Sequence, residues 1–87
     1  MIKSWTDDAW DDYVYWSEHD KKTERKIIKL IKEIDRNGYK GTGHPEPLKG
    51  DLTGYWSRHI DDKNRIVYKI ETGVIKIIQC GSHYRDK

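Results

Sequence analysis

The chain has 87 residues, enough for one small domain. Hydrophobic residues make up 34% and charged residues 37%, yet four Trp and six Tyr argue against a disordered chain, which would be poor in aromatic residues. A single cysteine excludes an internal disulfide, and no apolar run approaches the roughly 20 residues of a membrane-spanning helix. Since the N-terminus also has no signal-peptide pattern, we expect a cytoplasmic protein with no membrane partner.

The N-terminal part has the pattern of a short strand followed by a helix. Residues 2–5 are compatible with a strand, and Thr6 is a typical N-cap. Asp7 and Asp8 follow in the first turn, where the helix dipole favours acidic groups, and the helix is expected to end at about Glu18. One face of this helix would carry Ala9, Tyr13 and Trp16, with Trp10 and Val14 beside it.

A second helix is predicted between Asp20, which can cap it, and Asn37-Gly38, a typical helix stop. Apolar residues repeat at the spacing of one helical face, namely at Ile27, Leu30, Ile31 and Ile34. Much of the polar surface is basic, supplied by Lys22, Arg25, Lys26, Lys29, Lys32 and Arg36. This segment therefore predicts an amphipathic helix with a basic outer side.

Residues 38–50 form a predicted loop with four Gly and two Pro. Glu46 lies between Pro45 and Pro47, and a residue before proline is driven toward extended conformations. A short strand around Glu46–Leu48 is compatible with this pattern.

The C-terminal part predicts antiparallel strands at 55–60, 65–71 and 74–83, joined by turns at 61–64 and 72–73. In the middle strand, Ile66, Tyr68 and Ile70 are expected to face the helices, and Arg65 and Lys69 to face the other side. Cys80 lies in an apolar run and is expected to pack in the core. Two helices on one face of a mostly antiparallel sheet form an α+β domain.

Charge is divided unevenly along the chain. Residues 1–20 contain one Lys against six acidic residues, whereas residues 21–69 contain thirteen basic residues against seven acidic ones. This distribution could present a basic face to phosphates, although solvated helix and loop surfaces would produce the same pattern.

The residues that could cleave RNA are Glu46, Arg65, His83 and Tyr84, with Lys49 and Arg58 as candidate RNA-binding residues. RNA carries its own nucleophile, the 2′-OH, so cleavage needs a base, an acid and a cation near the phosphorane, but no metal. Glu46 suits the base, His83 the acid and Arg65 the cation. Tyr84 can stack on a nucleotide base, and Lys49 can hold a phosphate or lower the pKa of Glu46.

Each of these residues also has a structural interpretation: a solvated carboxylate, a surface ion pair, an exposed imidazole or a packed ring. The remaining histidines and Cys80 lack the spacing of a metal site, and the glycines lack a phosphate-loop pattern, so we expect neither metal nor cofactor. Residue types alone predict a small α+β domain with a partly basic sheet face, and indicate a nuclease only weakly.

Several stretches of the chain resemble toxins of the YoeB family. They are WDDYVYW at 10–16, GTGHPEPLK at 41–49, GYWSR at 54–58, NRIVY at 64–68 and CGSHY at 80–84. Together they cover nearly the whole chain in the family's order and spacing. The resemblance implies a single RelE-like domain over residues 1–87, with a short N-terminal strand, two helices and a mostly antiparallel sheet.

The resemblance also implies a function, namely metal-independent cleavage of messenger RNA in the ribosomal A site. Glu46 matches the family's general base, Arg65 its transition-state stabiliser and His83 its general acid. Tyr84 matches the residue that orients the nucleotide, and Lys49 a phosphate-contacting lysine. The implied partners are the ribosome, a YefM-like antitoxin in 2:1 or 2:2 complexes, a second copy of the chain, and operator DNA through the antitoxin only.

Two features depart from the family pattern. Residues 85–87 extend past His83-Tyr84, and His59 stands where a second arginine is expected, which could weaken contacts with ribosomal RNA. Two other functions are compatible with the fold: a ParE-like toxin that binds DNA gyrase, and a basic RNA-binding module without catalysis. The full set of Glu46, Arg65, His83 and Tyr84 favours the nuclease, because a pure binder does not need it.

Overall fold

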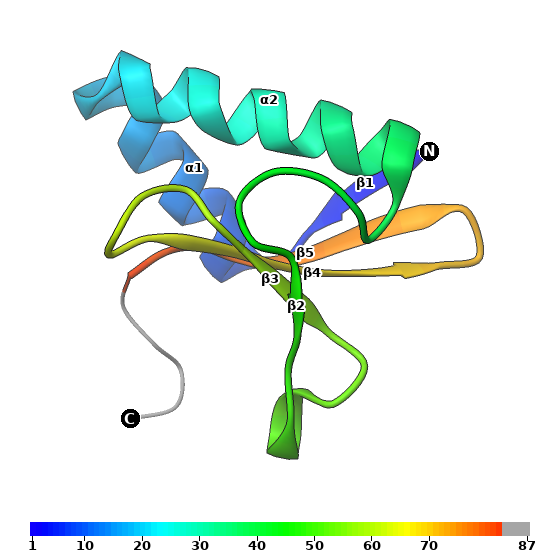
Figure 1. Cartoon of the computed structure of the whole chain (residues 1–87). Coiled ribbons are helices and arrows are strands. Elements are labelled where there is room, and N and C mark those ends of the chain that lie inside the picture. Colours follow the sequence, from blue (N-terminus) through cyan, green and yellow to red (C-terminus); the bar gives the residue numbers. More distant parts are fainter. Residues whose placement is uncertain (83–87) are drawn as a thin grey trace.

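The computed structural model describes residues 1–82 and has two layers, a five-stranded sheet with two helices on one of its faces (Figure 1). In chain order the elements are β1 (Ile2–Trp5), α1 (Asp7–His19), α2 (Lys21–Asn37), β2 (Glu46–Pro47), a 3-10 helix (Gly50–Leu52), β3 (Trp56–His59), β4 (Arg65–Glu71) and β5 (Val74–Gly81). The predicted α+β class is confirmed.

The sheet has the strand order β1-β5-β4-β3-β2. β1 runs parallel to β5 at one edge, and every other pair of neighbours is antiparallel. Two-residue β2 forms the opposite edge, where it pairs with β3. The strand that contains Glu46 is therefore the shortest and least supported one in the sheet.

Both helices begin at the predicted N-caps, and α2 also ends at the predicted Gly38. The Thr6 hydroxyl accepts a hydrogen bond from the third backbone N–H that follows it (3.1 Å), and Asp20 does the same for α2 (3.1 Å). Gly38, at a φ of 67°, ends α2 by donating its N–H to the Ile34 carbonyl (2.8 Å). α1 extends to His19, one residue beyond the prediction. Neither helix, within residues 1–82, is long and apolar enough to cross a bilayer.

The core lies between the two layers. The predicted α2 stripe of Ile27, Leu30, Ile31 and Ile34 is buried against a sheet surface made of Ile66, Tyr68, Ile75, Ile77 and Cys80. Burying one such aliphatic side chain contributes about 1.5–3 kcal/mol, so the contact between the two layers stabilises the fold. Ile70 is only partly buried, but it packs on the same side as predicted, and Cys80 is confirmed as a core residue.

A β-bulge interrupts the alternation of side chains along β5. Val67 pairs with Gln79 whereas the next residue, Tyr68, pairs with Ile77, so β5 contains one extra residue at this point. The bulge lets β5 be continuously apolar and still turn Gln79 to the side of the sheet away from the helices. β3 is shorter than predicted, since it includes neither Tyr55 nor Ile60.

Candidate active site

The sheet face that the helices leave open carries two of the predicted catalytic residues. Residues paired directly across neighbouring antiparallel strands place their side chains on the same face. One row across the sheet consists of Glu46, Ser57, Val67 and Gln79, and the next row of His59, Arg65 and Gly81. Glu46 and Arg65 therefore share the open face, and ordinary strand spacings put their Cα atoms about 12 Å apart. Two long side chains at that separation can reach the same nucleotide.

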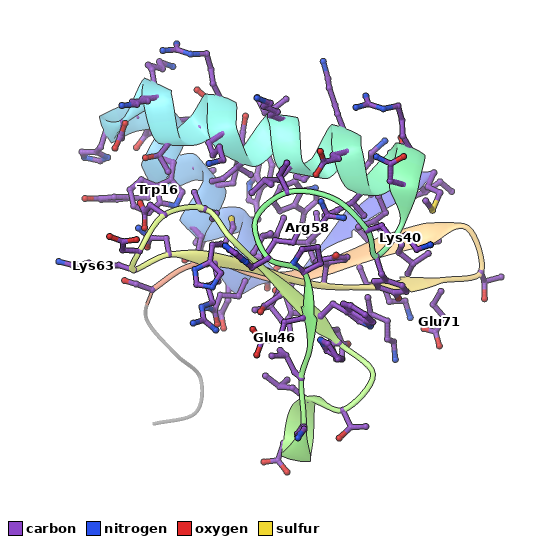
Figure 2. All side chains as sticks on the ribbon, in the orientation of Figure 1. Trp16, Lys40, Glu46, Arg58, Lys63 and Glu71 are labelled. Carbon is purple, nitrogen blue, oxygen red and sulfur yellow. The ribbon has the colours of Figure 1, made fainter. Side chains whose placement is uncertain are left out.

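Glu46 is presented by the edge strand. It is exposed, lies on the side of the sheet away from the helices (Figure 2), and is opposite Ser57 of β3. A further hydrogen bond from Leu48 N to Tyr55 O (2.9 Å) continues the pairing beyond β2. Lys49 follows as an exposed residue at the start of the 3-10 helix. The predicted extended conformation at Glu46 is confirmed by its place in β2.

Arg65 is half-buried and is the first residue of β4, directly after a tight turn. The Asp61 carboxylate holds this turn by accepting hydrogen bonds from the backbone N–H groups of Lys63 (2.9 Å) and Asn64 (2.7 Å). Burial raises the pKa of Asp61, but the hydrogen bonds from Asn64 and Lys63 outweigh it and leave the pKa below its ordinary value. The turn thus stays closed by an ionised carboxylate and sets the point at which Arg65 enters the sheet.

The end of β5 is held from the helix layer by two residues of α1. The buried Asp12 carboxylate accepts a hydrogen bond from the Cys80 N–H (3.0 Å), and the Trp16 indole donates to the Cys80 carbonyl (2.8 Å). These two side chains therefore position the strand that leads to the C-terminus. Asp12 and Trp16 both belong to the family-like stretch at 10–16, and no anchoring role was predicted for either. The only sequence signal for such a role was the position of the Asp12 carboxylate on the inner side of an amphipathic helix.

His83 and Tyr84 lie outside the described residues, so their predicted roles stay predictions. Gly81, two positions before His83, is paired with Arg65 at the end of β5. The described part of the chain thus ends beside Arg65, on the strand next to it.

Arg58 does not lie on the open face of the sheet but is fully buried on the other side, so the structure contradicts the prediction that it contacts RNA. Since Ser57 and His59 face the open side, strand alternation turns Arg58 toward the helices, where its exposed fraction is 0%. Its five N–H groups donate to the Tyr68 hydroxyl, the Glu33 carboxylate and the carbonyls of Gly38, Lys40 and Thr42. A guanidinium used in this way has no donor left for a phosphate.

Ser57 is a candidate that sequence reasoning missed. Its hydroxyl is buried beside Glu46 in the same row, and Oγ has no hydrogen-bond partner among residues 1–82. Buried hydroxyls are normally paired, so an unpaired one in the same row as Glu46 makes Ser57 a candidate site residue. Nearby, the rings of His44 and His59 meet edge to face at 5.8 Å between centroids. The part of the chain that the structure describes contains no group of three or more residues placed to hold a metal ion.

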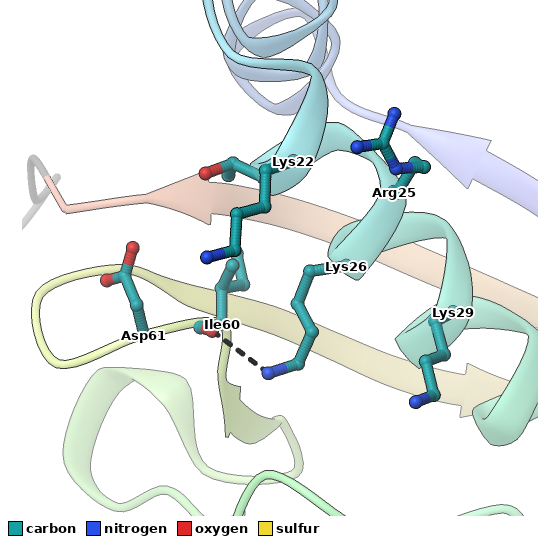
Figure 3. A pocket seen from close by; sticks show the side chains of 7 residues that line it. Lys22, Arg25, Lys26, Lys29, Ile60 and Asp61 are labelled. Carbon is teal, nitrogen blue, oxygen red and sulfur yellow. Dashed lines mark hydrogen bonds between the residues drawn. The ribbon is translucent and has the colours of Figure 1, made fainter.

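A basic groove runs along α2, away from the open sheet face. Figure 3 shows lysines and an arginine of α2 beside the turn at Ile60 and Asp61, with Lys26 Nζ donating to the Ile60 carbonyl (3.3 Å). Its lining residues are Lys22, Thr23, Arg25, Lys26, Lys29, Ile60 and Asp61. A second hollow shares Arg25 and Lys29 and continues past Lys32 to Arg36. The predicted basic outer side of α2 is therefore a continuous strip.

Two helices on one face of a five-stranded mixed sheet, with a parallel N-terminal edge strand, define the class of RelE-like toxins. Residues 5–84 match the model of a more specific family, described as a YoeB-like toxin of bacterial type II toxin–antitoxin systems. The chain belongs to this YoeB family, as its sequence motifs predicted.

Relatives are similar over nearly their whole length. Toxin YoeB of Streptomyces coelicolor is 51% identical over 84 residues, which is 97% of this chain and 100% of the relative. A YoeB–YefM heterotetrameric complex from Staphylococcus aureus contains a chain with 45% identity and a TM-score of 0.92, covering 97% of this chain and 98% of that one. The YoeB dimer from Staphylococcus aureus has 45% identity and a TM-score of 0.90, with the same coverage.

Proposed function

We propose that this toxin is an endoribonuclease that cuts messenger RNA in the ribosomal A site. The observation that carries the proposal is the shared open face of Glu46 and Arg65, with Gly81 paired to Arg65 just before His83. A carboxylate and a guanidinium within reach of one phosphate are two of the three groups that cleavage by the 2′-OH requires.

The proposed reaction starts when Glu46 takes the proton from the 2′-OH of the nucleotide before the cut. The 2′-oxygen then attacks phosphorus, and Arg65 stabilises the charge on the phosphorane. The P–O5′ bond breaks as His83 donates a proton to the 5′-oxygen, leaving a 2′,3′-cyclic phosphate, or a 3′-phosphate after hydrolysis, and a 5′-hydroxyl. Tyr84 orients the nucleotide, and Lys49 contacts a phosphate. His83 follows Gly81, the partner of Arg65 in the sheet, by two residues in the chain.

Ribosome binding is supported by the basic strip on α2. Lysine and arginine side chains along one helix match the regular negative charge of an RNA backbone. Protein–protein interfaces are instead depleted in lysine, and among the strip's residues 22–36 only Ile28 is an exposed large apolar residue. The strip therefore suits structured RNA, on the side of the molecule away from the messenger RNA.

The proposed protein partners follow from the relatives. The Staphylococcus aureus structures contain a YoeB–YefM heterotetramer and a YoeB dimer. We accordingly expect a homodimer, a YefM-like antitoxin that inhibits the toxin in 2:1 or 2:2 complexes, and operator binding through the antitoxin only. The toxin would act in the cytoplasm, where ribosomes translate.

Cleavage by purified protein on ribosomes programmed with a defined message tests the proposal. The wild type should cut in the A-site codon and leave 5′-hydroxyl ends, which accept a labelled phosphate from polynucleotide kinase without prior phosphatase treatment. Glu46→Ala, Arg65→Ala and His83→Ala should each lose about 10²–10⁴-fold in rate and permit growth without antitoxin.

Intact messenger RNA in this assay, together with inhibition of DNA gyrase, would refute the nuclease in favour of a ParE-like function. Intact messenger RNA on ribosomes that still bind the toxin would instead indicate an RNA-binding module. Unchanged toxicity of all three alanine variants would refute the assignment of the catalytic residues.

A further inference from the structure

The loop between α2 and β2 folds around a single buried side chain (Figure 2). Arg58 Nη2 donates to the carbonyls of Gly38 (2.9 Å) and Lys40 (2.8 Å), and Nη1 donates to the carbonyl of Thr42 (3.3 Å). Three alternate loop carbonyls thus converge on one guanidinium. Its Nε donates to the Tyr68 hydroxyl (3.1 Å), which fixes the guanidinium itself to β4.

The same loop is tied to α2 through Glu33. One oxygen of the Glu33 carboxylate pairs with Arg58 and also accepts hydrogen bonds from Thr42 N (2.8 Å) and Thr42 Oγ1 (2.9 Å). The backbone bond from Thr42, followed by its hydroxyl and the Arg58 guanidinium, keeps the pKa of Glu33 below its ordinary value despite burial, so the carboxylate stays ionised. A Cβ on Gly41 would overlap the Glu33 carboxylate and lie 2.8 Å from Arg58 Nη1, so the loop fits closely around the pair.

The closed loop leads directly to Glu46. Its last residue, Gly43, accepts a hydrogen bond from His59 N (2.7 Å), the residue after Arg58 in β3. Only His44 and Pro45 then separate Gly43 from Glu46, and β2 itself pairs with β3 at two residues. Such a short edge strand has little register stability of its own.

We propose that Arg58 and Glu33 form a buried clamp that closes loop 38–43 and thereby sets the position of Glu46 on the open face. Arg58 is thus a positioning residue for the cleavage reaction, because it acts through the loop and does not contact the substrate. The inference rests on the proposed function, because it concerns the geometry of the candidate general base. A base displaced by about 1 Å can cost on the order of 10²-fold in rate, so a small opening of the loop is enough to matter.

The test compares two carboxylates of α2 that lie two residues apart. Glu33→Ala removes the clamp, and Glu33→Gln keeps its acceptor oxygen but loses the charge. The matched control is Asp35→Ala, which breaks an ion pair of α2 with Lys3 and the N-terminal amine but does not contact the loop. For each protein, hydrogen exchange of the loop amides, unfolding in urea, and kcat and KM of ribosome-dependent cleavage are measured.

We expect Glu33→Ala to lower kcat by about 10- to 100-fold with little change in KM, and to speed exchange at Thr42 by on the order of tenfold or more. In kcat and in hydrogen exchange at Thr42, Glu33→Gln should lie between Glu33→Ala and the wild type. Asp35→Ala should match the wild type in both of these quantities. If Glu33→Ala does not fold, Glu33→Gln carries the same comparison at smaller amplitude.

Wild-type kcat in a folded Glu33 variant, or loop exchange no faster than in Asp35→Ala, would overturn the clamp. A loss of cleavage that only follows the unfolded fraction in urea would overturn it as well. If even the wild type leaves messenger RNA intact, the proposed nuclease fails, and Thr42 exchange alone then decides whether the loop is clamped.

Discussion

Arg58 and Arg65 lie on neighbouring antiparallel strands but point to opposite faces of the sheet. Arg58 faces the helix layer, is completely buried and uses all five donors within the chain. Arg65 faces the open side, is half-buried, and lies opposite His59 and Gly81. The same side chain therefore holds a loop on one face of the sheet and is offered to a substrate on the other.

The difference shows what a buried guanidinium requires. Removing a charge from water costs several kcal/mol unless excellent geometry and hydrogen bonds replace the lost hydration. Arg58 meets this condition with one carboxylate, one hydroxyl and three loop carbonyls. Arg65 does not need such a set, because the open face leaves part of it hydrated and able to exchange water for a phosphate.

The largest expected effect is on stability, and it should appear at one arginine only. Arg58→Met leaves Glu33 and three loop carbonyls without their donor, so the free energy of unfolding should fall by about 3–5 kcal/mol. Arg65→Met, the same change on the open face, should cost about 0.5 kcal/mol or less. Urea titrations of both variants measure this, and equal losses would remove the distinction between the two faces.

The next effect is on activity, and it should appear at the other arginine. Under the proposed function, Arg65→Met should lower kcat on programmed ribosomes by about 10²–10³-fold, because charge on the phosphorane is no longer stabilised. Arg65→Lys should lose less, since it keeps the charge without the planar fork. Single-turnover rates at saturating toxin provide the measurement, and a wild-type rate for Arg65→Met would assign the face another role.

A smaller effect is expected where α1 holds the end of β5. Trp16→Phe removes the donor to the Cys80 carbonyl and should reduce the free energy of unfolding by about 0.5–1.5 kcal/mol. Trp10→Phe is a suitable control, because Trp10 is exposed on the same helix and stacks on Tyr13. Urea unfolding of both variants tests the comparison, and an equal cost at Trp10 would contradict the special role of Trp16.

The smallest effect concerns an exposed ion pair, in contrast to the buried one at Arg58. Hydrogen bonds from Lys3 and then from the N-terminal amine lower the pKa of Asp35 from 3.8 to about 2. Because the folded-state pKa is the lower one, the pair stabilises the protein above pH 3.8, and this contribution is lost as the pH falls toward 2. Asp35→Asn should therefore flatten the decline in unfolding free energy between these pH values, and an unchanged slope would show that the pair contributes nothing.

Much of the architecture could be predicted from local patterns. The caps at Thr6, Asp20 and Gly38 act within one helical turn, and the apolar stripe of α2 depends on spacings of three and four residues. For the same reason the proline-flanked strand at Glu46 was predictable, because proline restricts only its immediate neighbours. Among the candidate site residues, Arg65 was correctly expected on the face away from the helices.

Sequence patterns did not reveal the side of the sheet to which Arg58 turns. β3 is four residues long, and a shift of one residue would reverse every side chain, so its orientation depends on pairing with β4 rather than on its own pattern. The roles of Glu33 and Asp12 were hidden for a related reason: their partners, Arg58 and Cys80, are 25 and 68 residues away in the chain.

Helices, caps and family motifs could thus be predicted from the sequence, because each depends on residues a few positions apart and on backbone preferences that act locally. Packing of the two layers then determined which arginine is buried, which loop it holds and how the strand ends are anchored. These outcomes depend on contacts between distant segments, and their free energies arise only when the sheet register and the helix layer form together.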